Sequence, residues 1–221
     1  MTSKFIDPTI QPIDSIASGD PVPVDRLTLD ALRCRFAFPP EWQPEIKEEP
    51  LFIDRDWVSA AVLIPLVDRP KGLSLLLTQR SMQLKDHPGQ ISFPGGRVDE
   101  VDDTYIETAL REAKEEIGID RNHIEILGLM PEYRTGSGFK VVPVVSIVHP
   151  PFEICLNRKE VDAVFELPFH FFMTGTNYQV RSANFPNGRG RRNFYTIPCQ
   201  GRFVWGATAA MLRNLYHFLR A

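Results

Sequence analysis

The most regular pattern of apolar and polar positions predicts an amphipathic helix over about Thr104–Ile117. Thr104 and Glu107 form a candidate capping box at its start, and Asp103 is a competing cap. Gly118 predicts the end, because glycine readily adopts the left-handed backbone that closes a helix. A stripe of apolar side chains would face the core, and it consists of Ile106, Ala109, Leu110, Ala113 and Ile117.

Shorter apolar runs on both sides of this helix predict strands. Trp57–Val67 is apolar and β-branched enough for a buried strand, and a turn leads from it into a second strand at Leu73–Thr78. Thr208–Leu219 has helical spacing again. The other strand-like runs are Ile91–Phe93, Ile124–Met130 and Val141–Val148, with weaker ones near Val164, Tyr178 and Phe194–Ile197. The pattern therefore predicts one α/β domain in which helices pack on a mixed sheet.

The N-terminal part differs in composition and is rich in proline. Eight prolines fall within the first fifty residues, and proline interrupts both helices and sheet ladders. One short helix is predicted with Asp25 as its cap, and its apolar positions are Leu27, Leu29, Leu32 and Phe36. We expect residues 1–52 to form an extension packed on a main domain at residues 53–221, with the first twenty or so residues as a candidate for disorder.

Composition and charge narrow the function classes. Of 221 residues, 43% are hydrophobic and 24% are charged, which is typical of a globular protein. No apolar run approaches the roughly 20 residues of a membrane span, and no secretory signal is visible, so no membrane partner is expected. Three widely spaced cysteines argue against a disulfide framework or zinc cluster and fit a cytoplasmic location. A net charge of −3 does not suggest nucleic acid as a partner.

Charge is distributed unevenly along the chain. After Glu166 there is no Asp or Glu, and seven arginines give this part a charge of +7, which leaves −10 for the remainder. Such segregation favours an anionic ligand. Arg189, Arg191 and Arg192 lie in a stretch with the composition of a hairpin tip. They are candidates for binding substrate, and a solvated hairpin tip is the alternative.

Three carboxylates share one flank of the predicted helix. At 100° per residue, Glu112, Glu115 and Glu116 fall together beside the buried stripe. Like charges this close raise one another's pKa, and Mg²⁺ or Mn²⁺ would offset them. The alternative is a solvated acidic face balanced by Arg111 and Lys114.

Two glycines precede the helix and complete a motif. Gly95 and Gly96 let a backbone pass close to a ligand and are candidate substrate-binding positions. The segment resembles the box of Nudix hydrolases, Gly-x5-Glu-x7-Arg-Glu-U-x-Glu-Glu-x-Gly-U, where U is a bulky aliphatic residue. The matching residues are Gly96, Arg111, Glu112, Glu115, Glu116, Gly118 and Ile119. Three features depart from the pattern: Ala113 is small, Asp102 or Asp103 replaces the first Glu, and the spacing before the Arg is one residue longer.

The resemblance implies a fold, a reaction and roles for these residues. The fold would be a Nudix-type α/β/α sandwich on a mixed sheet, and the reaction hydrolysis of a nucleoside diphosphate linked to another group. Glu112 and Glu116 would bind the metal, and Glu115 would be a further ligand or orient water. Arg111 would form an ion pair that holds the acidic residues, and Gly96 would let the loop wrap the helix. The implied catalytic set is Glu115, Glu116 and Arg111.

The segment before the box narrows the range of expected substrates. Residues 76–96 resemble the signature of coenzyme A pyrophosphatases, Leu-Leu-Thr-x-Arg-Ser/Ala-x3-Arg-x3-Gly-x3-Phe-Pro-Gly-Gly, with Lys85 in place of the second Arg. Residues 205–209 resemble the close of that subgroup. Arg80 and Lys85 would leave the second strand beside the glycine turn, where a polyphosphate would lie. His87 is a candidate catalytic group, and a loop histidine held by the backbone is the alternative.

These observations predict a Mg²⁺- or Mn²⁺-dependent pyrophosphatase that cleaves coenzyme A or its thioesters into 3′,5′-ADP and 4′-phosphopantetheine or its acyl form. One or more of Arg189, Arg191 and Arg192 would then meet the 3′-phosphate. One alternative is a Nudix pyrophosphatase for ADP-ribose, NADH or another nucleotide. Another is a catalytically silent Nudix module that binds a nucleotide. A homodimer is compatible with the sequence.

Overall fold

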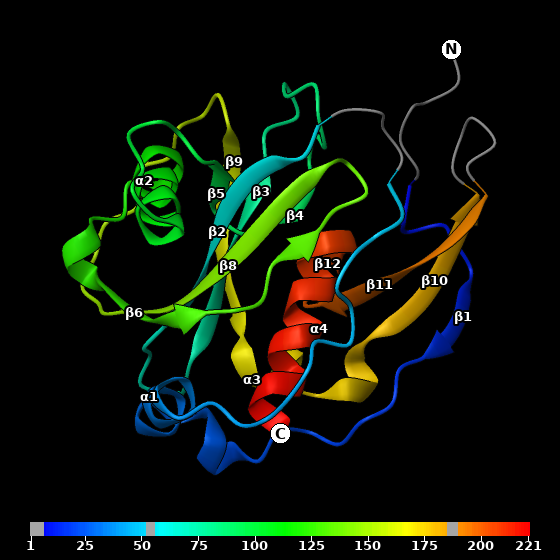
Figure 1. Ribbon diagram of the computed structural model, residues 1–221, viewed down its shortest axis with the longest axis horizontal. Helices are drawn as coiled ribbons and strands as arrows, with labels where there is room; N and C mark the ends of the chain where they lie inside the picture. Colours follow the sequence, from blue (N-terminus) through cyan, green and yellow to red (C-terminus); the bar gives the residue numbers. More distant parts are fainter. Residues whose placement is uncertain (1–6, 52–55, 185–189) are drawn as a thin grey trace.

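The predicted strands assemble into a mixed sheet of eight strands in the computed structural model, which describes residues 7–51, 56–184 and 190–221. The strands are β2 (Val58–Val67), β3 (Ser74–Arg80), β4 (Ile91–Ser92), β5 (Gly95–Arg97), β6 (Ile124–Leu129), β7 (Tyr133–Arg134), β8 (Phe139–Val148) and β9 (Val161–Pro168). β2 and β8 run parallel along their length, whereas β2 and β5 are antiparallel, as are β3 and β9. The sheet is therefore mixed, as the sequence predicts (Figure 1).

Helix α2 (Tyr105–Ile117) covers one face of this sheet and confirms the clearest helix of the sequence pattern. Thr104, not Asp103, is its N-cap, and its Oγ1 accepts a hydrogen bond from the Glu107 N–H at 3.2 Å. Gly118 ends the helix with a φ of 76°. The helix and the sheet pack together through a cluster of buried apolar side chains, three of which are alanines. The cluster consists of Ala61, Leu63, Ala109, Ala113 and Val144.

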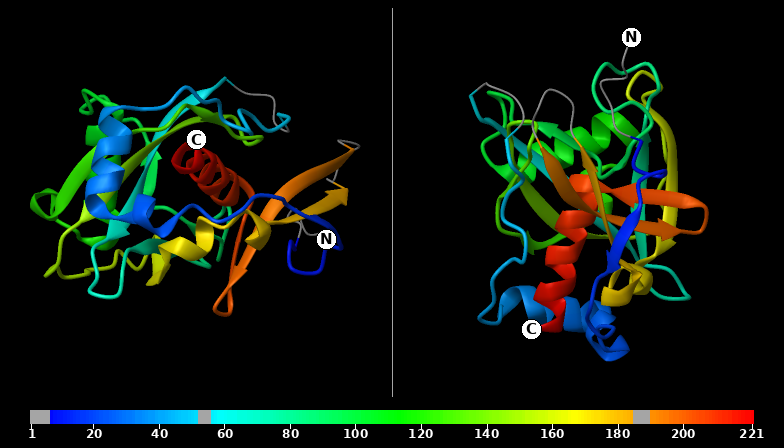
Figure 2. Two further views of the ribbon diagram at one scale, coloured as in Figure 1. Left: turned by 90° about the horizontal axis from the view of Figure 1, so that it is seen from below. Right: turned by 90° about the vertical axis from the view of Figure 1, so that its right-hand side faces the viewer.

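Helix α4 (Gly206–Arg220) packs on the opposite face of the sheet. All its predicted inward positions are buried: Met211, Leu212, Leu215 and Phe218. Their partners on the sheet include Ile64, Leu75, Leu77, Val145 and Ile147. The arrangement is an α/β/α sandwich, which confirms the predicted fold class (Figures 1 and 2). Among the described residues, no helix is both long and apolar enough to cross a membrane.

A second sheet lies beyond α4 and includes part of the N-terminal extension (Figure 1). Its strands, in spatial order, are β1 (Ile13–Ile16), β10 (Gln179–Asn184), β11 (Arg191–Cys199) and β12 (Arg202–Trp205). β1 pairs antiparallel with β10, so the expected disorder of the first twenty residues is wrong for this segment. The pairing partner lies far along the chain, and the local pattern of residues 13–16 gives no sign of it.

The short N-terminal helix is present but begins later than predicted. It consists of a 3₁₀ turn, η1 (Val24–Leu27), followed by α1 (Leu29–Ala37). The cap of α1 is Thr28, whose Oγ1 accepts a hydrogen bond from Ala31 N–H, so the predicted cap at Asp25 is wrong. The remaining short helices are η2 (Arg121–His123), α3 (Phe169–Phe172) and η3 (Gly175–Asn177).

A polar network around Glu45 connects the rest of the extension to α4 and β11. Glu45 accepts hydrogen bonds from Arg213 at 2.9 Å and Tyr195 at 2.5 Å, and it also contacts His217. These contacts lower the pKa of Glu45 to about 2, with the His217 contact as the largest cause. The Arg213 guanidinium also lies over the ring of Tyr178. These contacts hold the segment around Glu45 against α4 and β11.

Candidate active site

Arg111 is the centre of an ion-pair network at the glycine turn. Its Nε and Nη2 donate to the two carboxylate oxygens of Asp102 at 3.0 and 2.8 Å. Its Nη1 donates to Glu112 at 2.9 Å and to Glu115 at 3.1 Å. The Asp102 side chain is only 3% exposed, and hydrogen bonds from Arg111 hold the pKa of its carboxyl well below the usual range. Of the two candidate acids before the helix, Asp102 is therefore the partner of Arg111, while Asp103 is exposed.

Glu116 is a buried carboxylate beside the same turn. Its side chain points from α2 toward the backbone of Gly95, whose N–H lies 3.4 Å from Oε2. The residue is 4% exposed. Burial, and then the charge of Glu112, raise the pKa of Glu116 to about 8, while Arg80 acts in the opposite direction. A carboxyl in this environment gains from a nearby cation.

The two glycines give the carboxylates room to approach the loop. A β-carbon at Gly96 would lie 2.4 Å from Oε1 of Glu112, and one at Gly95 would lie 2.4 Å from the carbonyl oxygen of Ala61. Both distances are far below van der Waals contact. Glu112 and Glu116 therefore converge on the glycine turn. Glu115, the third predicted ligand, points outward with a side chain that is 54% exposed.

Arg80 lies at the end of β3 and acts electrostatically on Glu116. Its Nη2 is 3.5 Å from the carbonyl oxygen of Asp86, and its Nε is buried without a hydrogen-bond partner. Most of the donors of this guanidinium are therefore only weakly used. Lys85 lies on the following loop and is exposed.

Glu160 is a fourth carboxylate of the site that sequence reasoning missed. Its charge contributes, after burial and nearer groups, to the raised pKa values of both Glu112 and Glu116. Its Oε1 accepts a hydrogen bond from Asn157 Nδ2 at 3.0 Å, and the Asn157 N–H donates to the Glu116 carbonyl at 2.9 Å. The segment before β9 is thus tied to α2. No local motif marks Glu160, because only the folded chain brings it to the helix.

Two of the three predicted 3′-phosphate arginines, Arg191 and Arg192, belong to the second sheet. Arg189 lies outside the described residues. Arg191 and Arg192 are on β11, where they hold the N-terminal extension. Arg191 donates to Ser182 at 2.7 Å and Asp14 at 2.9 Å. Arg192 donates to the carbonyl oxygens of Pro50 at 2.5 Å and Leu51 at 3.4 Å. These contacts give both arginines a structural role.

The carboxylates have the chemistry of a divalent-cation site. Glu112, Glu116 and Glu160 supply hard oxygen donors and like charges that a cation would offset. Within residues 7–51, 56–184 and 190–221, however, no three His, Cys, Asp or Glu side chains are arranged to hold an ion. Glu112 contacts Arg111 instead. Binding an ion would therefore exchange part of this Glu112–Arg111 contact for a metal contact.

A family model for the NUDIX domain matches residues 57–170, which contain the glycine turn, α2 and Glu160. The chain belongs to the Nudix hydrolase family. The match ends before the second sheet, so α4 and β10–β12 lie outside the matched range. Arg80, Arg111 and the three box glutamates all lie within it.

Full-length relatives carry the same Nudix name. The chain is 40% identical over 189 residues to the "Uncharacterized Nudix hydrolase NudL" of Shigella flexneri serotype 5b, covering 86% of this chain and 93% of the relative. The NudL of Salmonella heidelberg is 40% identical over 190 residues, covering 86% and 94%. Among solved structures, a MutT/nudix family protein from Enterococcus faecalis matches with a TM-score of 0.44 and 16% identity, covering 75% of this chain and 63% of that one. That last similarity is too distant to bear on substrate.

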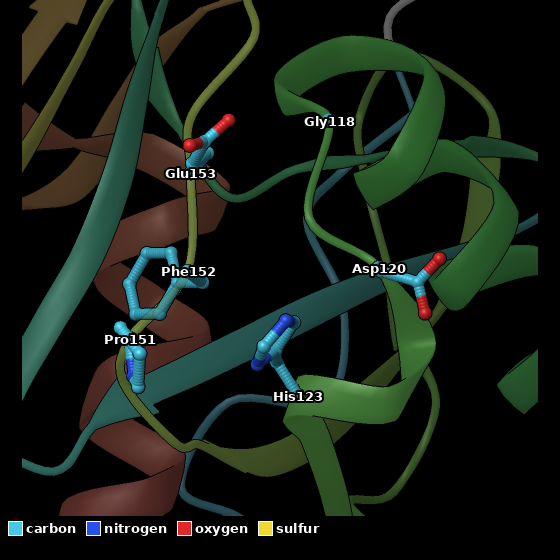
Figure 3. A pocket seen from close by; sticks show the side chains of 6 residues that line it. All are labelled: Gly118, Asp120, His123, Pro151, Phe152 and Glu153. Carbon is cyan, nitrogen blue, oxygen red and sulfur yellow. The ribbon is translucent and has the colours of Figure 1, made fainter.

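A separate cavity of about 410 Å³ lies beyond the C-terminal end of α2 (Figure 3). None of its lining residues is a predicted site residue. Asp120 and Glu153 lie on opposite sides of it, with His123 between them in this view. These side chains do not converge on a common point. The lining residues are Gly118, Asp120, His123, Pro151, Phe152 and Glu153.

Proposed function

We propose that this Nudix hydrolase is a divalent-metal-dependent pyrophosphatase that cleaves coenzyme A or its thioesters. The observation that carries the proposal is the convergence of Glu112 and Glu116 on the glycine turn, with Arg80 acting on Glu116 from β3. This arrangement combines carboxylates for a cation with a guanidinium for a phosphate. A bound Mg²⁺ or Mn²⁺ would neutralise pyrophosphate charge and activate a water molecule.

Different residues of the site would bind the ion, orient its ligands and bind the substrate phosphate. Glu112, Glu116 and Glu160 would hold it, and Arg111 would keep Glu112 oriented through their hydrogen bond. Glu115 accepts a hydrogen bond from the same Nη1 of Arg111 and is 54% exposed, so its role would be to balance the charge of that guanidinium. Arg80 would donate to a non-bridging phosphate oxygen and so stabilise the charge that develops there.

The substrate assignment rests on the sequence. Leu76–Gly96 retains the coenzyme A pyrophosphatase signature except at Lys85, which keeps the charge but loses the bidentate geometry of Arg. Because Lys85 is exposed on the loop after Arg80, it would meet an outer phosphate rather than the reacting one. Arg191 and Arg192 already donate to Asp14 and to the Pro50 carbonyl oxygen, so a 3′-phosphate bound by them would replace these contacts.

The experiment is an identification of products by mass spectrometry. Purified protein is incubated with coenzyme A, acetyl-coenzyme A, ADP-ribose and NADH, each with Mg²⁺ or Mn²⁺ and with EDTA. We expect metal-dependent release of 3′,5′-ADP from coenzyme A, and no release by the Glu116→Gln variant. Turnover of ADP-ribose or NADH alone would keep the Nudix chemistry but reject the substrate. No turnover of any compound would favour a silent nucleotide-binding module.

A further inference from the structure

The loop between β3 and β4 carries His87 and folds back on Arg80, the residue from which it starts. Two backbone hydrogen bonds close the base of this loop, because Arg80 receives one from Gly89 at 3.1 Å and donates one to Gln90 at 3.0 Å. The Gln90 N–H also donates to the His87 carbonyl at 3.3 Å, which forms a tight turn. The chain therefore folds back so that residues 86–87 lie near the residue from which the loop starts.

The contacts of Arg80 show how close this approach is. Its Nη2 is 3.5 Å from the carbonyl oxygen of Asp86, the residue immediately before His87. His87 has a φ of 55°, in the left-handed region that few residues other than glycine occupy and that histidine enters more readily than most. A hydrogen bond with the Gln90 side chain fixes the ring. A half-buried ring held by a hydrogen bond, beside a guanidinium whose Nε has no hydrogen-bond partner, supplies donors for an anion.

The electrostatic surroundings of His87 come from three elements. Burial lowers the pKa of the imidazole, and Arg80 on β3 lowers it further. Asp86 on the loop and Glu49 on the N-terminal extension act in the opposite direction. Without a ligand the ring is therefore neutral near pH 7. An anion bound by both the ring and the guanidinium would raise the pKa of the imidazole, because its negative charge favours the imidazolium.

We propose that His87 and Arg80 together bind one phosphate of the substrate, and that His87 takes up a proton from solvent when this anion binds and returns it on release. The inference rests on the proposed pyrophosphatase function, since it assigns a further substrate-binding residue to the same site. Substrate affinity would then rise as the pH falls through neutrality, and His87 would be the source of this dependence.

The test compares the wild type with His87→Asn, which tolerates a positive φ and cannot carry the charge. Binding of methylenediphosphonate with Mg²⁺ is measured by calorimetry in two buffers of different ionisation enthalpy. We expect greater proton uptake in the wild type than in the variant. The variant should bind at least about tenfold more weakly in mildly acidic buffer, the effect of losing one charge-assisted hydrogen bond. The exposed His170 provides a control variant, His170→Asn, which should behave as the wild type.

A second variant separates the ring from the backbone. His87→Gly removes the imidazole and readily adopts the positive φ, so it should bind as weakly as His87→Asn if the ring contacts the anion. Wild-type proton uptake or affinity in either variant overturns the inference, as does failure of the wild type to bind the probe. Coenzyme A turnover is measured separately. Its absence alongside His87-dependent proton uptake would reject the substrate assignment and leave the role of His87 intact.

Discussion

The carboxylate of Glu112 lies directly over the backbone of Gly96, with Oε1 only 2.4 Å from the point that a β-carbon at Gly96 would occupy. The same carboxylate accepts a hydrogen bond from Arg111 at 2.9 Å. Glu112 is therefore confined between a guanidinium and a stretch of bare backbone. Its position depends as much on the missing side chain of Gly96 as on the contacts that it makes.

Replacing Gly96 with Ala should displace Glu112 and lower kcat/KM by about a hundredfold, since small misplacements of site groups have effects of this size. Gly128→Ala is the matched control, because its β-carbon would lie 2.7 Å from Phe36, outside the site. The control should lose stability but keep the activity of its folded fraction. Steady-state kinetics and thermal unfolding are measured for both variants. Equal kcat/KM values for Gly96→Ala and Gly128→Ala would show that the space at Gly96 is unimportant for catalysis.

Glu116 should make the metal-free protein less stable as the pH rises. Its pKa is raised from 4.5 to about 8 in the folded state, so the unfolded chain releases this proton first. The free energy of unfolding should fall between these two pH values, by an amount on the order of a few kcal/mol. Glu116→Gln removes the cost of ionising this buried carboxyl, so in EDTA at pH 8 the variant should resist urea better than the wild type.

The control for this experiment is Glu115→Gln. The Glu115 side chain is 54% exposed, and exposed ion pairs contribute about 0–1 kcal/mol. The free energy of unfolding of Glu115→Gln should stay close to that of the wild type both below pH 4.5 and at about pH 8. If Glu116→Gln were instead less stable than the wild type at pH 8, the burial of Glu116 would not be the destabilising feature described here.

The Arg111–Asp102 pair should be strongly coupled. Asp102 is nearly inaccessible at 3% exposure, and Arg111→Gln would remove its cationic partner at a cost of about 3 kcal/mol. Asp102→Asn should cost less, and the double variant should be more stable than the sum of the single effects implies. Urea unfolding of the four proteins gives the coupling free energy. A value near zero would mean that the pair does not hold this loop.

Glu160→Gln should lower kcat at least about tenfold, because it removes a carboxylate that acts on both Glu112 and Glu116. Glu153→Gln is a suitable control, since Glu153 is an exposed carboxylate in the same connecting segment. The two variants are compared over a range of Mg²⁺ concentrations. Equal kcat for both at saturating metal would remove Glu160 from the catalytic site.

The helix and its carboxylates could be predicted because their signals are local. The apolar stripe of α2, its cap at Thr104 and its end at Gly118 all lie within fifteen consecutive residues. Glu112, Glu115 and Glu116 follow from the same periodicity, although only the structure shows that Glu115 points outward. The choice of Asp102 over Asp103 also needed the fold, because it depends on the geometry of the loop and not on spacing.

The features that escaped prediction depend on contacts between distant segments. Glu160 reaches the site because Asn157 binds the end of α2, and nothing in the sequence around Glu160 reports that contact. Residues 13–16 become a strand only by pairing with β10. Arg191 and Arg192 were singled out by composition, which does not reveal that Asp14 and the Pro50 carbonyl are their partners.

The most direct test of the central claim is kcat/KM for coenzyme A at saturating Mg²⁺, measured for the wild type and for Glu116→Gln, with release of 3′,5′-ADP as the readout. We expect ready turnover by the wild type and a loss of at least about a hundredfold in the variant, since Glu116 would lie at the metal. A variant that releases 3′,5′-ADP as fast as the wild type would contradict the assignment of the site.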